Sequence, residues 1–164
     1  MPNSAKQWGI LILFIVLCQG AGIIGTFVTF DAIPTWYATL VRPSFSPPNW
    51  IFGPVWTTLY TLMGVSAYLV WAKRGLPPTK ATIRTKGLWI FWVHLFFNAL
   101  WSLLFFGLQS PLLALVDIAV LWVLLVASMF YFFRISKTAG ALLVPYLVWI
   151  SFASVLNAAI LLLN

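Results

Sequence analysis

The chain alternates between long apolar runs and short polar or basic segments. A helix needs about 20 mostly apolar residues to cross the hydrocarbon core of a bilayer. Five runs reach that length, which predicts an all-α, integral membrane protein built as a five-transmembrane-helix bundle. The predicted spans cover about residues 8–30, 49–72, 87–107, 111–133 and 139–163.

Composition indicates the same class of protein. Of the 164 residues, 63% are hydrophobic and 7% are charged, whereas a soluble domain carries about 25% charged residues. So few polar groups cannot cover the surface of a soluble domain. We expect residues 1–164 to form a single transmembrane domain, and the only cysteine, Cys18, excludes a disulfide within the chain.

The basic residues predict an orientation in the membrane. Five crossings place the N-terminus and the connections after the second and fourth spans on one side. Basic residues accumulate on the cytoplasmic side, so we expect a cell (inner) membrane with the N-terminus in the cytoplasm; an outer membrane is the alternative. This distribution also explains the net charge of +7 without nucleic acid as a partner. Arg42 lies alone on the other side, whereas the first side carries Lys6, Lys73, Arg74, Lys80, Arg84, Lys86, Arg134 and Lys137.

The connection that leads into the second span is rich in aromatic residues and prolines. Pro34 and Pro43 should limit helix formation, and the Pro47–Pro48 pair favours an extended approach to the second span. Within that span, several residues share one face at three- and four-residue spacing. Glycines beside large aromatics on this face leave room for a flat ligand, and ordinary helix packing is the alternative. The face consists of Gly53, Trp56, Tyr60, Met63, Gly64 and Ala67.

The third span is the most polar one. Buried polar side chains in hydrocarbon need partners, so Asn98 should either bond to another helix or contact a ligand. His94 has no second histidine and no cysteine or carboxylate cluster beside it, which predicts that there is no metal site. Trp101 and Ser102 lie near these two residues on the same face. The fifth span repeats the order of aromatic, small and polar residues on one face, with Tyr146, Trp149, Ala153 and Asn157.

Two further features resemble chemical motifs. Residues 20–25 match the dinucleotide pattern GxGxxG, which has meaning only between a strand and a helix. In a membrane span, Ala21 and Gly25 instead predict close approach of another helix. Asp117 is the only acid within a predicted span. Since no partner base accompanies it, we favour a structural role, such as accepting a tryptophan N–H, over a proton relay.

The chain resembles the TspO/translocator protein family, the tryptophan-rich sensory proteins also called peripheral-type benzodiazepine receptors. The resemblance extends over all five spans in order. It implies a five-helix bundle, often a homodimer, with a pocket near the connection between the first two spans. Members of the family bind porphyrins such as protoporphyrin IX and haem, and isoquinoline or benzodiazepine drugs. The resemblance rests on the segments WYATLVRPSFSPPNWIFGPVWTTLYTLMG, FNALWSLLFFG and LLVPYLVWISFASVLN.

Matching the positions of the family motif implies which residues form the pocket. Arg42 is added because an arginine at this connection can pair with a ligand carboxylate, and Tyr60 because it shares the face of Trp56. Animal members of the family bind cholesterol through a tyrosine followed by a basic residue, and no basic residue follows Tyr146 here. The chain therefore departs from the family pattern for sterol binding at this position. The expected ligand-binding residues are Tyr37, Arg42, Trp56, Tyr60, Asn98, Trp101, Trp149 and Ala153.

The resemblance implies a membrane receptor or sensor that binds porphyrins and regulates tetrapyrrole or stress responses, with no required cofactor. Two alternatives stay open. Light-dependent porphyrin breakdown is attributed to some bacterial members, and Trp56 and Trp149 would then be the catalytic residues, because indoles can donate an electron to an excited porphyrin. A porphyrin or sterol transporter is the other alternative, although broken helices or inverted repeats would be expected of it.

Overall fold

The computed structural model describes residues 4–164, which are helical almost throughout and contain no strand. This confirms the predicted all-α class. The helices are α1 (Ala5–Ala32), α2 (Phe52–Trp71), α3 (Pro78–Ser102), α4 (Pro111–Ile135), the short α5 (Lys137–Leu142) and α6 (Val144–Leu163). Three short segments extend them, the π-helical turns Ile33–Tyr37 and Leu103–Gly107 and the 3₁₀ turn Asn49–Ile51.

Local sequence explains several helix starts. The side chains of Ser4, Ser110 and Ser136 accept backbone N–H groups at the starts of α1, α4 and α5, which is the usual role of serine as an N-cap. Pro111 occupies a first-turn position of α4, where its missing N–H costs nothing. Pro145 lies in the first turn of α6, and a proline cannot supply the N–H that would continue α5. The chain is therefore interrupted at Leu143.

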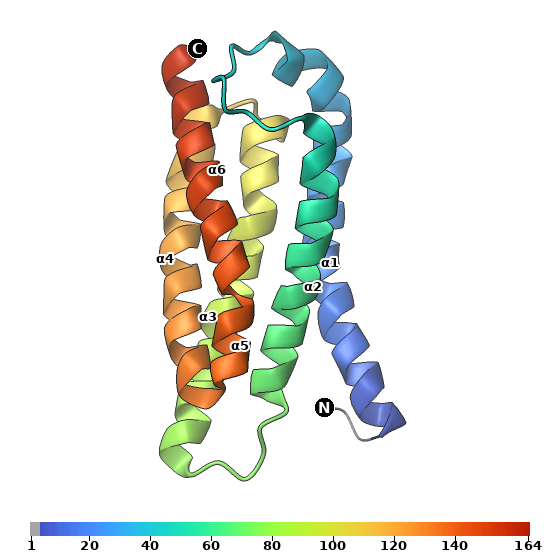
Figure 1. Cartoon of the computed structure of the whole chain (residues 1–164), viewed down its shortest axis with the longest axis vertical. Coiled ribbons are helices and arrows are strands. Elements are labelled where there is room, and N and C mark those ends of the chain that lie inside the picture. The colour runs from blue at the N-terminus through green and yellow to red at the C-terminus, as the bar shows by residue number, and fades with distance from the viewer. Residues whose placement is uncertain (1–3) are drawn as a thin grey trace.

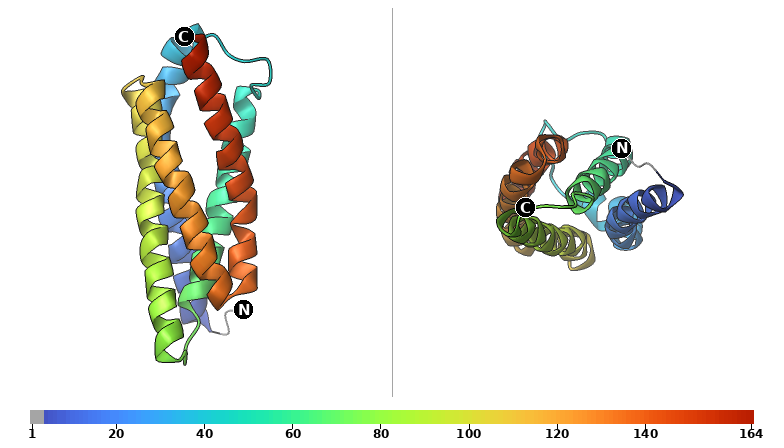
Figure 2. Two further views of the ribbon diagram at one scale, coloured as in Figure 1. Left: turned by 90° about the vertical axis from the view of Figure 1, so that its left-hand side faces the viewer. Right: turned by 90° about the horizontal axis from the view of Figure 1, so that it is seen from below.

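The helices run up and down along one axis (Figure 1). The N-terminal end of the bundle carries the connection of residues 72–77, and the C-terminal end carries residues 38–48 and the last turn of α6. Seen along the axis, the helices surround the centre of the bundle (Figure 2). Helix α1 packs on α2 and α3, α3 on α4, and α4 on α5 and α6, while α2 contacts α5 but hardly approaches α6.

Four helical segments of the described chain are long and apolar enough to cross a membrane: Ala5–Tyr37, Pro78–Gly107, Pro111–Ile135 and Lys137–Leu163. They support an integral membrane protein, as do apolar side chains such as Phe27 and Leu162 that stand fully out from the bundle. Helix α2 has 20 residues and is long enough to cross a membrane. Its threonines and tyrosines lower its mean hydropathy, so it is not among these four segments. The predicted count of five spans is therefore not confirmed.

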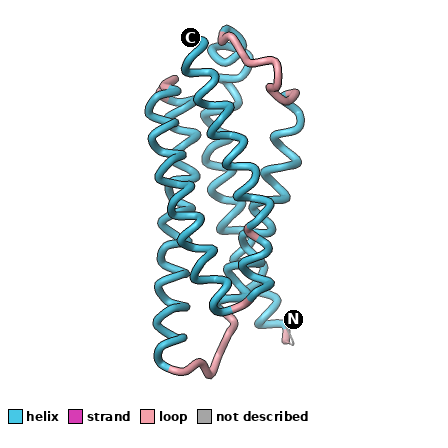
Figure 3. The backbone as a smooth tube through the Cα atoms, turned by 60° about the vertical axis from the view of Figure 1, so that its left-hand side comes forward, coloured by secondary structure: helices cyan, strands magenta, loops and turns pink. Residues whose placement is uncertain are grey.

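Helical structure extends beyond two of the predicted spans. Pro34 was expected to limit the first helix, yet helical structure continues through the π-helical turn to Tyr37 (Figure 3), because such a turn tolerates a broken hydrogen-bond ladder. The third helix was expected near Gly87, with a solvated connection before it. It begins at Pro78 instead, because proline is favoured in the first turn of a helix, so most of the basic connection is helical.

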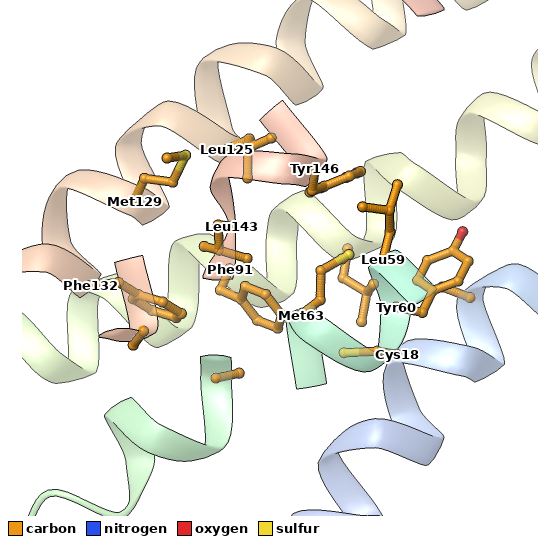
Figure 4. Close-up of a cluster of buried hydrophobic side chains, with 14 of the residues drawn as sticks. Cys18, Leu59, Tyr60, Met63, Phe91, Leu125, Met129, Phe132, Leu143 and Tyr146 are labelled. Carbon is orange, nitrogen blue, oxygen red and sulfur yellow. The ribbon is translucent and has the colours of Figure 1, made fainter. Parts of the chain in front are cut away.

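The main apolar core lies in the half of the bundle nearer its N-terminal end. Figure 4 shows side chains from α1, α2, α3, α4 and α6 gathered in one cluster, together with Leu143 from the interruption before α6. Phe91 of α3 and Phe132 of α4 stack in this cluster with ring centroids 5.6 Å apart. Cys18 is buried there as a free thiol. This half of the bundle is thus filled by packed side chains.

Close helix contacts depend on glycines. A Cβ atom at Gly64 of α2 would lie 2.6 Å from Cα of Ile15 in α1, and one at Gly25 would lie 2.7 Å from Oγ of Ser102. The close approach predicted at Gly25 is therefore confirmed. The predicted ligand face of α2 holds only in part, because Gly64 is a helix contact and Met63 and Ala67 are fully buried.

We predict that Gly64→Ala destabilises the bundle by about 1–3 kcal/mol, because its methyl group would meet the backbone of α1 and force the two helices apart. The matched control is Gly20→Ala in α1, where a Cβ would have no atom within 4 Å. Thermal unfolding in detergent should show a lower midpoint for Gly64→Ala alone. Equal midpoints for the two variants would contradict the tight contact.

A candidate ligand-binding cavity

A cavity of about 410 Å³ lies in the half of the bundle nearer its C-terminal end. It occupies the region where α2 and α6 do not pack on each other, and α1, the turn after it and α3 close its other sides. Small residues keep it open, since a Cβ at Gly53 would contact no atom within 4 Å. Seven of the eight predicted site residues line it, namely Tyr37, Trp56, Tyr60, Asn98, Trp101, Trp149 and Ala153.

Packed aromatic rings form the walls. The Trp56 ring stacks on Tyr60 with centroids 5.2 Å apart and an interplanar angle of 26°. On α6, Trp149 meets the edge of Phe52 at 5.7 Å. Such contacts hold the rings in fixed orientations. The cavity therefore has preformed indole walls from two helices that are far apart in the sequence.

A chain of hydrogen bonds crosses the bundle at the base of the cavity. The Tyr60 hydroxyl donates to Oδ1 of Asn98 at 2.6 Å, and Nδ2 of Asn98 donates to the Tyr146 hydroxyl at 2.7 Å. The Tyr146 hydroxyl also lies 3.1 Å from Nε2 of His94. Asn98 therefore links three helices, which is the first alternative left open by the sequence, and it also borders the cavity. Its contact with a ligand stays a prediction.

His94 is fully buried and bonded within this network, and residues 4–164 contain no group of three potential metal-ligating side chains. The expected structural bond of Asp117 is not formed. Both of its carboxylate oxygens are buried without a partner, and the residue does not line the cavity. No tryptophan N–H donates to it, since those of Trp101 and Trp122 bond to Asn157 and Ser151.

Several polar residues of the cavity were missing from the predicted site, among them Gln19 and Asn157. Gln19 donates from Nε2 to the Thr57 carbonyl at 2.9 Å and to Oγ1 of Thr61 at 3.1 Å. Asn157 accepts the indole N–H of Trp101 at 3.2 Å and donates to the Pro111 carbonyl at 2.8 Å. A signal existed for Gln19, because a lone amide inside an apolar span must find a partner.

Comparison with known proteins identifies the family. The model of the TspO/MBR family matches residues 14–163. The chain belongs to the TspO/MBR family. This confirms the resemblance drawn from the three sequence segments.

Relatives within the TspO/MBR family come from bacteria and animals. The chain is 45% identical over 163 residues to the tryptophan-rich protein TspO of Chlorobaculum tepidum, covering 97% of this chain and 98% of the relative. It is 33% identical to the tryptophan-rich sensory protein of Cereibacter sphaeroides, covering 96% and 93%. It is 39% identical to the translocator protein of Homo sapiens, covering 74% and 70%.

Arg42 is the one predicted site residue that does not line the cavity of this TspO/MBR family member. Its Nη1 donates to Oδ1 of Asn49 at 3.4 Å, and its guanidinium lies 5.5 Å from the centroid of the Tyr37 ring. Both partners line the cavity. Arg42 therefore stands at the rim, in the connection of residues 38–48.

Charge is absent from the cavity wall itself. The residues that line the wall are apolar, aromatic, hydroxyl or amide side chains, and none is acidic or basic. One polar group is left over, because the buried Nε1 of Trp149 has no hydrogen-bond partner. The site thus suits a largely apolar, flat molecule, while charged groups of a ligand have a counter-charge only at the rim.

The connection above the cavity is held down by α6. The side chain of Asn164 accepts the Val41 N–H at 2.9 Å and donates to the Val41 carbonyl at 3.0 Å. Phe45 packs edge-on against Phe152, with centroids 6.3 Å apart. The residues next to Arg42 are therefore fixed from both sides.

We predict that Asn164→Ala loosens this connection. Losing the two hydrogen bonds to Val41 should speed amide exchange of residues 38–46 about tenfold, since each bond contributes about 0.5–1.5 kcal/mol. Hydrogen–deuterium exchange with mass spectrometry measures this directly. Leu162→Ala, at an exposed position of the same turn, is the control and should leave exchange unchanged; unchanged exchange in Asn164→Ala as well would show that these bonds do not hold the connection.

Proposed function

We propose that this chain is a membrane receptor or sensor that binds porphyrins, such as protoporphyrin IX or haem, in the cavity between α2 and α6. The observation that carries the proposal is that two indoles from different helices, Trp56 and Trp149, line one uncharged cavity. A porphyrin is flat and aromatic, so offset stacking on these rings is favourable. The cavity volume of about 410 Å³ lies within the range of small-molecule pockets, about 300–1,000 Å³.

The uncharged wall determines how a porphyrin would be oriented. Burying an unpaired carboxylate is costly, so the two propionates of a porphyrin should stay at the rim while the macrocycle enters. Arg42 stands at that rim beside Asn49 and is able to pair with a carboxylate through two hydrogen bonds.

The same two indoles favour a second candidate function, light-dependent porphyrin degradation. Excitation of a bound porphyrin by light makes it an electron acceptor, and an adjacent indole is able to supply the electron. Dioxygen would be the oxidant that finally consumes the macrocycle. The cavity contains no cysteine, histidine or carboxylate, so the photochemistry of the ligand would have to drive the reaction.

We also propose that α2 is a fifth membrane span and that the N-terminal end of the bundle faces the cytoplasm of an inner membrane. Helix α2 packs along α1 and, like the other long helices, extends along the bundle axis (Figure 1). Its lower apolarity fits its position, since part of its surface faces the cavity and the core rather than lipid. Eight basic residues at one end against Arg42 at the other support the orientation.

We predict that Trp56→Ala and Trp149→Ala each weaken protoporphyrin IX binding about tenfold, because one stacking surface of the cavity is lost. Trp56→Phe should keep most of the affinity. At equal occupancy under light and oxygen, however, it should bleach the porphyrin Soret band much more slowly than the parent. Porphyrin fluorescence gives the affinity, and the absorption spectrum follows the bleaching.

The exposed Trp50→Ala is the matched control, because Trp50 does not line the cavity. Unchanged affinity in both alanine variants would refute binding between the indoles. If Trp56→Phe bleaches porphyrin as fast as the parent, the tryptophans are binding surfaces only. The proposed degradation would then be refuted, and the proposed porphyrin-binding receptor would not.

We predict that the connections on either side of α2 lie on opposite sides of the membrane. Thr39→Cys and Thr79→Cys place thiols at exposed positions of the two ends, while the native Cys18 is buried and the parent provides the blank. In intact cells, a membrane-impermeant maleimide should label Thr39→Cys, and it should label Thr79→Cys only after permeabilisation. Labelling of both variants from one side would show that α2 does not cross.

A further inference from the structure

A second groove lies at the N-terminal end of the bundle, where α2 ends and α3 begins. Its volume is about 300 Å³, and it shares no residue with the cavity described above. Its walls are formed by Trp71, Arg84, Thr85, Leu88, Trp89 and Trp92. Three indoles and one guanidinium therefore meet in one place.

The two guanidinium groups at this groove, those of Arg84 and Arg74, have contacts within the chain but no acidic partner among the described residues. Nη1 of the half-buried Arg84 donates to the backbone carbonyl of Lys73 at 2.6 Å, which gives the guanidinium a hydrogen bond but no counter-charge. Arg74 does not line the groove, but its guanidinium lies 4.5 Å from the centroid of the ring of Trp71, which does. A guanidinium carries five N–H donors, and paired donors of this kind match phosphate oxygens.

No acidic side chain of the chain is placed to neutralise this end of the bundle. The sequence contains two acids, Asp31 and Asp117. Asp31 belongs to the last turn of α1 and Asp117 to the second turn of α4, and both of these turns lie toward the C-terminal end of the bundle (Figure 1). This chain therefore supplies no counter-charge to Arg74 or Arg84.

The aromatic walls indicate what kind of molecule that is. The Trp89 side chain is 68% exposed, and Trp92 is fixed in the wall by Phe14 of α1, with centroids 5.7 Å apart. Tryptophans of membrane proteins concentrate at the depth of the lipid headgroups. The groove thus has a cationic end beside the polar connection and an apolar side that continues toward hydrocarbon. A soluble anion would leave that apolar side uncovered.

We propose that this groove is a binding site for an anionic phospholipid, whose phosphate is held by Arg84 and Arg74 while an acyl chain lies against Trp89 and Trp92. Recognition of this kind combines charge attraction at the membrane surface with burial of apolar area. The site is independent of the proposed porphyrin cavity, so a test of it needs no porphyrin.

The test uses the full chain purified in a neutral detergent and titrated with dioleoyl phosphatidylglycerol, with bound lipids counted by native mass spectrometry. The parent should bind phosphatidylglycerol in preference to phosphatidylcholine. The double variant Arg74→Gln/Arg84→Gln should lose affinity for phosphatidylglycerol at least about tenfold. The matched control, Lys80→Gln/Lys86→Gln, removes two charges from the same segment outside the groove and should change the affinity less than about twofold.

If both double variants lost the same affinity for phosphatidylglycerol, the lipid would be attracted by the charged surface in general, and the proposed site would be overturned. Unchanged affinity in both double variants would overturn it too. Displacement of the lipid by inorganic phosphate at equal concentration would assign the groove to a soluble anion and overturn the lipid. Trp89→Ala tests the acyl-chain contact without changing any charge, and it should weaken phosphatidylglycerol binding about threefold or more. Trp8→Ala, at an exposed position of α1, is its control and should leave binding unchanged. Unchanged binding in Trp89→Ala would overturn the acyl-chain contact.

Discussion

Hydrocarbon offers no hydrogen-bond partner, so polar side chains inside the bundle have to satisfy one another. The chain of bonds from Tyr60 through Asn98 and Tyr146 to His94 meets this requirement. It ties α2, α3 and α6 together at one level of the bundle. Because these bonds hold only in one relative placement of the three helices, they also define the base of the cavity. The separation of α2 from α6 above that level depends on this anchoring.

The bundle is divided along its axis by the kind of residue at its helix contacts. In one half, Gly64 lets α1 and α2 touch through their backbones, and large side chains fill the centre. In the other half, small residues such as Gly53 and Ala153 stand beside indoles that do not meet. The same residue type therefore gives close packing at one level and open space at another. The difference lies in the neighbouring helix, which packs closely against the glycine at Gly64 and does not at Gly53.

The periodicity of single helices predicted which residues share a face. A period of 3.6 residues places Trp56 and Tyr60 on one face, and Trp149 and Ala153 on another. That these two faces line one pocket was implied by the resemblance to the family and not by local sequence. Pairings between distant segments did not follow. The bonds of Gln19 to α2 and of Asn164 to Val41 join residues far apart in the sequence, and nothing local specifies them. For the same reason, sequence spacing gave no way to separate Gly64 as a helix contact from Gly53 as a cavity wall.

Helix α6 carries three parts of the site at once. It provides the wall residue Trp149, the ring of Phe152 under the connection, and Asn164, which binds that connection from above. The interruption at Leu143 separates this helix from α5, while α6 packs along α4. A shift of α6 that widens the cavity would also displace residues 41–45, because α6 holds them through Phe152 and Asn164. The size of a bound molecule and the ease of entry past Arg42 are thus mechanically coupled through a single helix.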